Sequence, residues 1–121
     1  MSEVLSTAIK TGYLIKYGSI KLLFVKKRFF LLDSTSLNYY TTEKLDWQIG
    51  SINLKSENVS FMRGESRMKL EESKNLILIE INERSYFLSA ETNDEANSWI
   101  ESLCEVVHSA DNQMKDNSIK I

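Results

Sequence analysis

The spacing of apolar residues changes once along this chain, at Ala90. Before that residue, apolar and polar residues alternate in short runs, which is the pattern of half-buried β-strands. Turn-forming clusters such as Gly18-Ser19 and residues 33–36 separate the runs. The pattern predicts seven short strands, over residues 12–17, 22–32, 37–42, 49–54, 58–62, 75–81 and 85–90.

The spacing after Ala90 is that of a helix. Thr92 and Glu95 have the separation of a capping box, in which two side chains satisfy free N–H groups of the first turn. The apolar residues then recur at intervals of three and four and form one helix face: Ala96, Trp99, Ile100, Leu103 and Val107. We predict that the helix ends near His108 and that residues 109–121 form a flexible tail or linker.

These elements define one mainly β domain, because 121 residues ordinarily make a single domain. We place it at residues 9–108, after an N-terminal extension of residues 1–8. Seven antiparallel strands and one helix predict a strongly bent antiparallel sheet, or partly open barrel, capped by the C-terminal amphipathic helix. Since Trp99 and Leu103 would close one end, the other end is the natural place for a binding site.

The composition argues against several classes of protein. The only cysteine, Cys104, cannot form a disulfide within the chain, which suits a reducing compartment. It lies close to the only histidine, His108, late in the predicted helix, and neither has a partner at the spacing of a catalytic pair or a metal site. We therefore expect no enzymatic activity, no cofactor and no metal. No apolar run approaches the roughly 18–20 residues that cross a bilayer, and no signal peptide is visible, which favours the cytoplasm.

The net charge of −2 conceals an uneven distribution along the chain. Residues 1–32 contain six basic residues and one acidic residue, for a net charge of +5. Residues 33–121 carry 9 basic and 16 acidic residues, a net charge of −7 that argues against nucleic-acid binding. Strands from the first segment would present a positive field to an anion.

Strand alternation indicates where those cations lie. Lys16, Lys26 and Arg28 each share a strand face with apolar residues that belong in the core, and so does Tyr39. If the first three strands are neighbours, these four side chains meet at the open end. Arginine offers phosphate a planar fork, lysine a point charge and tyrosine a neutral donor, so the group predicts an anion site.

The order of these segments resembles a pleckstrin homology (PH) domain over residues 8–108. The resemblance rests on the runs at residues 11–16, 26–32, 37–40, 50–54 and 86–90, and on Ala96 and Trp99-Ile100 in the helix. It implies the fold described above and a module that recruits its parent protein to membranes by binding a phosphoinositide. It also implies reversible recruitment from the cytoplasm to the plasma membrane.

A narrower resemblance is to the PH domains that recognise 3-phosphorylated inositol lipids, and loosely to the N-terminal domain of protein kinase B-type kinases. It implies that Lys16 and Arg28 hold the 3- and 4-phosphates of a 3,4-bisphosphate or 3,4,5-trisphosphate lipid, with Lys26 nearby and Tyr39 donating to a phosphate. Some strong binders carry an arginine where this chain has Gln48-Ile49, and Arg84 is the candidate to replace it. The resemblance also implies that the domain is the N-terminal regulatory part of a larger signalling protein, such as a Ser/Thr kinase.

Three further residues are candidates for contact with the membrane surface: Lys21, Leu23 and Lys27. We expect a monomer whose partner is the headgroup of an anionic membrane lipid. The alternative is a protein-interaction module of the same fold, with a peptide or small GTPase as partner and only weak, non-selective binding of anionic lipid.

Overall fold

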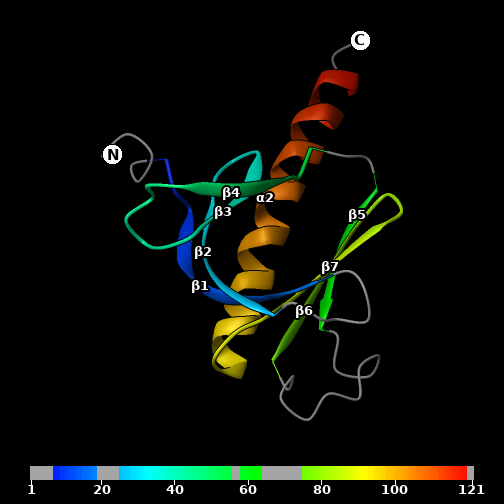
Figure 1. Cartoon of the computed structure of the whole chain (residues 1–121). Coiled ribbons are helices and arrows are strands. Elements are labelled where there is room, and N and C mark those ends of the chain that lie inside the picture. Colours follow the sequence, from blue (N-terminus) through cyan, green and yellow to red (C-terminus); the bar gives the residue numbers. More distant parts are fainter. Residues whose placement is uncertain (1–6, 19–24, 56–57, 64–74, 120–121) are drawn as a thin grey trace.

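The computed structural model describes residues 7–18, 25–55, 58–63 and 75–119, with the backbone alone for residues 109–119. Seven strands and one long helix make up the described chain (Figure 1). The elements are β1 (Lys10–Tyr17), β2 (Lys26–Leu32), β3 (Ser36–Tyr40), β4 (Gln48–Asn53), β5 (Val59–Arg63), β6 (Leu76–Ile81), β7 (Arg84–Ser89) and α2 (Asn93–Ile119). The predicted fold class is confirmed.

All seven strands belong to one antiparallel sheet, in the order β4-β3-β2-β1-β7-β6-β5. Pairing between β1 and β2 is continuous, from Lys10 opposite Leu32 to Lys16 opposite Lys26. By contrast, β1 pairs with β7 over three residues only. The sheet therefore curves around α2, with β1–β4 on one side of the helix and β5–β7 on the other (Figure 1).

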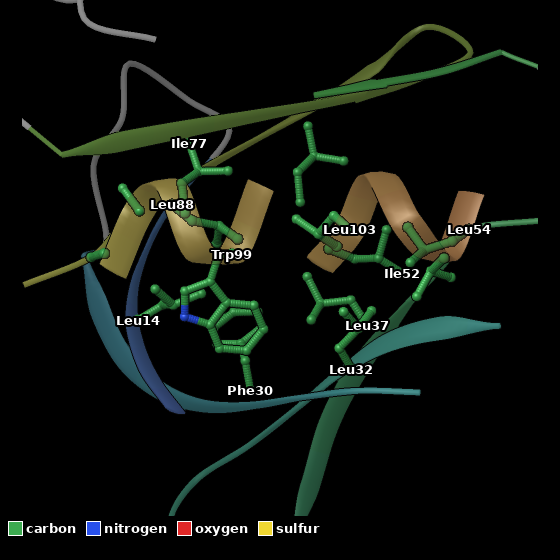
Figure 2. Packing of buried hydrophobic residues seen from close by; sticks show 14 residues of the cluster. Leu14, Phe30, Leu32, Leu37, Ile52, Leu54, Ile77, Leu88, Trp99 and Leu103 are labelled. Atoms are coloured by element: carbon green, nitrogen blue, oxygen red, sulfur yellow. The ribbon is translucent and has the colours of Figure 1, made fainter. Parts of the chain in front are cut away.

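The helix fills the space between these two halves of the sheet. Trp99 and Leu103, each 1% exposed, lie between Ile77 and Leu88 on one side and Phe30 on the other (Figure 2). The core thus takes the inner face of every long strand, as the alternation predicted. The helix does not cover the whole inner face of the sheet, and the uncovered part is available to contact a ligand.

Local hydrogen bonds hold α2 in place. The Glu95 N–H donates to the hydroxyl of Thr92 at 3.1 Å, which confirms the predicted cap. Arg63, at the end of β5, donates to the side chains of Asn93 at 2.8 Å and Asn97 at 2.7 Å. These bonds fasten the first turns of the helix to the far half of the sheet.

The helix continues well past His108, to Ile119, so the prediction that it ends near His108 was wrong. Residues 109–119 have no regular apolar spacing, and this absence suggested a frayed end. However, they contain neither glycine nor proline, and an established helix extends at little cost through residues that do not interrupt it.

Candidate functional site

Three cations lie on the inner face of β1 and β2, beyond the part that the helix covers. Residues opposite one another in an antiparallel pair point to the same side, and here Leu14 pairs with Arg28 and Lys16 with Lys26. Leu14 is 2% exposed and belongs to the core, which fixes this side as the inner one. Phe30, next along the same face of β2, is fully buried. The predicted alternation of core residues and cations is therefore present.

Tyr39 joins this face from β3. It pairs with Phe30, and the two rings stack with their centroids 5.3 Å apart. The Nζ atom of Lys16 lies 5.5 Å from the centroid of the Tyr39 ring. The structure thus brings Lys16, Arg28 and Tyr39 together from three adjacent strands.

Strand β7 completes the group with Arg84 and Tyr86. Leu88 pairs with Lys16 and is fully buried, so alternation puts Tyr86 and Arg84 on the same inner face. The guanidinium carbon of Arg84 lies 5.4 Å from the centroid of the Tyr86 ring, a cation–π contact. Tyr86 was not among the predicted site residues, although its alternation with Leu88 was already visible in the sequence.

We refer to these six side chains as the inner-face cluster: Lys16, Lys26, Arg28, Tyr39, Arg84 and Tyr86. Within the described part of the chain, none of its four cations forms an ion pair with a carboxylate. Lys26 and Arg84 are exposed, whereas the other four members are partly buried. The cluster therefore has unneutralised positive charge beside partly buried hydrogen-bonding groups, which suits an anion with several charges.

The pKa of Tyr39 fits this arrangement. Burial raises the pKa of its phenol above the ordinary value, and proximity to Tyr86 adds to the rise. The positive charges of Arg84 and Arg28 lower it in part, which also places both arginines in the surroundings of the phenol. Tyr39 is therefore a neutral hydrogen-bond donor at physiological pH.

Three of the predicted residues are not members of this cluster. Lys27 is on the outer face of β2, with its Nζ atom 5.1 Å from the centroid of the Tyr13 ring, so it does not face the cluster. Lys21 and Leu23 lie outside the described residues. Contact of these three with a membrane stays a prediction.

The fold is thus a bent antiparallel sheet packed around one helix, with a group of cations on its inner face that form no ion pair with a carboxylate of the described residues. The PH domain family model matches residues 8–108, and the chain belongs to this family. The resemblance to a PH domain seen in the sequence is thus confirmed.

Known relatives agree with this assignment. The chain is 30% identical to the C-terminal PH domain of human pleckstrin, covering 84% of this chain and 80% of that one, with a TM-score of 0.68. A structure of the C-terminal PH domain of pleckstrin in complex with D-myo-Ins(1,2,3,4,5)P5 matches with 30% identity, covering 82% of this chain and 97% of that one, with a TM-score of 0.65. The Slm1 PH domain, solved with phosphoserine, has a TM-score of 0.70 at 16% identity, over 85% of this chain and 98% of that one, and shares the fold.

The chain is also similar to part of a much longer protein. It is 29% identical over 106 residues to the Rho GTPase-activating protein gacFF of Dictyostelium discoideum. The match covers 83% of this chain but only 12% of that protein. Among the residues that the structure describes, no helix is both long and apolar enough to span a membrane.

Proposed function

We propose that this domain binds the headgroup of a phosphoinositide at the inner-face cluster and so recruits its parent protein to a membrane. The observation that carries the proposal is the convergence of Lys16, Arg28 and Tyr39 from three adjacent strands. Two arginines and two lysines without carboxylate partners among the described residues would otherwise repel one another. A multiply charged phosphate ligand relieves that repulsion.

Each member of the cluster has a defined part in such binding. The planar guanidinium groups of Arg28 and Arg84 can each donate hydrogen bonds to two phosphate oxygens at a time. Lys16 and Lys26 each add a compact charge on a flexible side chain, which can adjust to the position of a phosphate. Tyr39 donates a hydrogen bond without adding charge, because its pKa is raised. Tyr86 supports Arg84 through their 5.4 Å cation–π contact.

We favour a lipid phosphorylated at the 3-position, as the 3,4-bisphosphate or the 3,4,5-trisphosphate. This preference rests on the spacing of Lys16, Gly18, Lys26 and Arg28, which is similar to that of 3-phosphoinositide-binding PH domains. The 30% identity to a pleckstrin domain solved with an inositol pentakisphosphate supports binding of an inositol phosphate, and leaves the choice of isomer to experiment.

The parent is, in this proposal, a larger signalling protein that the domain brings from the cytoplasm to the plasma membrane. The similarity to one segment of a Rho GTPase-activating protein supports a signalling parent and gives no preference to a kinase. Peptide or small GTPase binding is the competing function. It would use a sheet edge or the helix surface rather than the inner-face cluster.

The test is calorimetric titration with soluble inositol phosphate headgroups that carry or lack the 3-phosphate. We expect Arg28→Ala to abolish binding while leaving the melting temperature nearly unchanged, because Arg28 is only partly buried. Lys55→Ala is the matched control. Lys55 is an exposed lysine that follows the last residue of β4, at the opposite ends of the strands from the cluster. Equal binding by wild type and Arg28→Ala would contradict the proposed site, and unfolding of Arg28→Ala would show that Arg28 is structural.

A further inference from the structure

Strand β4 is an edge of the sheet (Figure 1). It pairs with β3 on one side, and among the described residues no strand pairs with its other side. The side chains of Gln48, Ile49, Ser51 and Asn53 are exposed, so the described chain does not cover this strand. A free edge presents a row of unpaired N–H and C=O groups, which another strand can bind.

The hydrogen bonds to β3 tell which groups of β4 point to the free edge. The Leu54 N–H, just after the strand, donates to the Thr35 carbonyl at 2.9 Å. In an antiparallel pair, residues that bond to the partner strand alternate with residues that do not. Ile52 therefore bonds to β3, as Leu54 does. The N–H and C=O groups of Ser51 and Asn53 point away from β3, to the free edge.

The two edges of the sheet differ in how they are protected. Proteins protect edge strands with charged side chains, proline, bulges or a covering helix. The other edge strand, β5, ends at Arg63, whose guanidinium donates to two side chains of α2. Strand β4 contains neither a charged residue nor a proline. Its register shift opposite Tyr39 and Tyr40 lies near its start and leaves residues 50–53 regular, so these residues are suited to pairing with another strand.

We propose that two copies of this chain pair through their β4 strands, antiparallel to one another and around a two-fold axis at Ser51. In such a dimer the same surface of both copies forms the interface, which is the commonest symmetry of homo-oligomers. The sheet then continues from one copy into the other, with Ser51 opposite Ser51 of the second copy. This inference does not depend on headgroup binding, and it replaces the expectation of a monomer.

The residues that flank β4 are complementary in this register. Trp47 and Lys55 are each four residues from Ser51, so antiparallel pairing brings Lys55 of one copy to Trp47 of the other. Trp47 is 68% exposed and Lys55 is exposed, and an ammonium group over an indole is a favourable contact. Asp46, exposed beside Trp47, meets the same lysine. Within the part of the chain that the structure describes, neither Asp46 nor Lys55 forms an ion pair.

These contacts favour a second copy as the occupant of the edge. Ile49, which is 43% exposed, lies opposite Asn53 of the second copy in the same register. The edge of one copy thus supplies both partners of each contact, aromatic ring with cation and carboxylate with ammonium. Because the axis is two-fold, every contact away from the centre forms twice.

Sedimentation equilibrium of the wild-type chain measures this association directly. We expect a reversible equilibrium between monomer and dimer. Ser51→Pro removes an N–H that points to the free edge but no bond to β3, and it should weaken the dimer by about tenfold. Ser51→Ala is the matched control, because it loses the hydroxyl that donates to Asn38 Oδ1 at 2.6 Å but keeps the N–H. It should dimerise as the wild type does.

A charge exchange tests the register. Asp46→Lys and Lys55→Glu should each weaken the dimer when made alone, because each places like charges close together. The variant with both substitutions restores opposite charges between the copies and should recover the wild-type affinity. A folding defect cannot produce that recovery.

Two results would overturn the inference. The first is a wild-type chain that stays monomeric up to about 1 mM protein, because a dimer with a Kd of that order would be visible there. That result would leave the edge to an extended segment of another protein. The second is a dimer that neither Ser51→Pro nor the charge exchange affects, since the copies would then meet elsewhere. If Ser51→Pro fails to fold, the charge exchange alone decides between these results.

Discussion

The phenol ring of Tyr39 lies directly over the α-carbon of Gly50, its partner across the β3–β4 ladder. A β-carbon at position 50 would overlap the Tyr39 hydroxyl and lie 2.6 Å from its Cζ atom, closer than any van der Waals contact allows. Glycine at position 50 is therefore what lets Tyr39 lie flat along the inner face, stacked on Phe30. The position of Tyr39, which we propose as a hydrogen-bond donor to phosphate, thus depends on the absence of a side chain one strand away.

Gly50→Ala should displace the Tyr39 ring and destabilise the domain by about 1–3 kcal/mol, the usual cost of overpacking. In a Tyr39→Ala background the overlap is gone, so the same substitution should cost much less. A double-mutant cycle measured by urea unfolding gives the coupling free energy between the two sites. Additive effects would show that the ring is free to move aside.

The raised pKa of Tyr39 predicts a loss of stability at high pH. Burial is the main cause of the raised pKa, and the nearby Tyr86 adds to it, so the phenol of the folded protein stays protonated above its ordinary pKa of 10.0. The same phenol in the unfolded chain loses its proton near pH 10.0. The free energy of unfolding should therefore fall as the pH rises through that value. Tyr39→Phe cannot ionise and should lose less stability between pH 8 and pH 11. Parallel pH profiles for the two proteins would contradict the assignment.

Asp33 should stabilise the turn between β2 and β3 in a pH-dependent way. Its Oδ1 atom accepts hydrogen bonds from the N–H groups of Thr35 at 2.9 Å and Ser36 at 2.8 Å, and Asn38 donates to Oδ2 at 3.1 Å. Partial burial raises the pKa of this carboxyl, but the hydrogen bonds from Thr35 and Ser36 together outweigh burial and hold the pKa below 3.8.

The stabilisation by Asp33 is therefore present above pH 3.8 and is lost as the pH falls through the lowered pKa of the folded protein. At pH 7, Asp33→Ala should cost about 1–2 kcal/mol through lost hydrogen bonds. Urea unfolding at pH 7 and pH 2.5 measures this difference, which should shrink at the lower pH. An equal difference at both values would mean that the carboxylate charge is irrelevant to the turn.

Salt should separate the proposed function from its alternative. The Debye length falls from about 10 Å at 0.1 M salt to about 3 Å at 1 M, so attraction between exposed cations and a phosphorylated headgroup weakens steeply. Titrations with the soluble headgroup at increasing sodium chloride should show an affinity loss of at least tenfold across that range. A salt-independent affinity would point to an apolar contact elsewhere on the domain.

The sequence was sufficient to predict the strands and the start of the helix, because the residue patterns that specify them are local. Alternation predicted all seven strands to within a few residues for the parts that the structure describes, and the Thr92 cap marked the start of α2. Alternation also put Lys16, Arg28 and Tyr39 on one face, and the register confirms that placement. Successive side chains of a strand point to opposite faces, so one residue known to be buried tells which face every other side chain of that strand occupies.

What the sequence did not reveal depends on contacts between distant elements. Arg63 donates hydrogen bonds to Asn93 and Asn97, and nothing near Arg63 in the chain shows that these side chains lie within its reach. The space that Gly50 leaves for Tyr39 is likewise visible only once β4 is paired with β3. The end of α2 was placed too early because a polar helix without glycine or proline has no stop signal.

The measurement that tests the account most directly is co-sedimentation with vesicles that each carry one phosphoinositide isomer, beside vesicles with phosphatidylserine alone. The account predicts selective pelleting of the wild type with 3-phosphorylated lipids, and loss of that pelleting in a folded Arg28→Ala protein. Equal pelleting with every anionic vesicle would contradict the proposed selectivity. No pelleting with any vesicle would contradict membrane recruitment itself and direct the search to a protein partner.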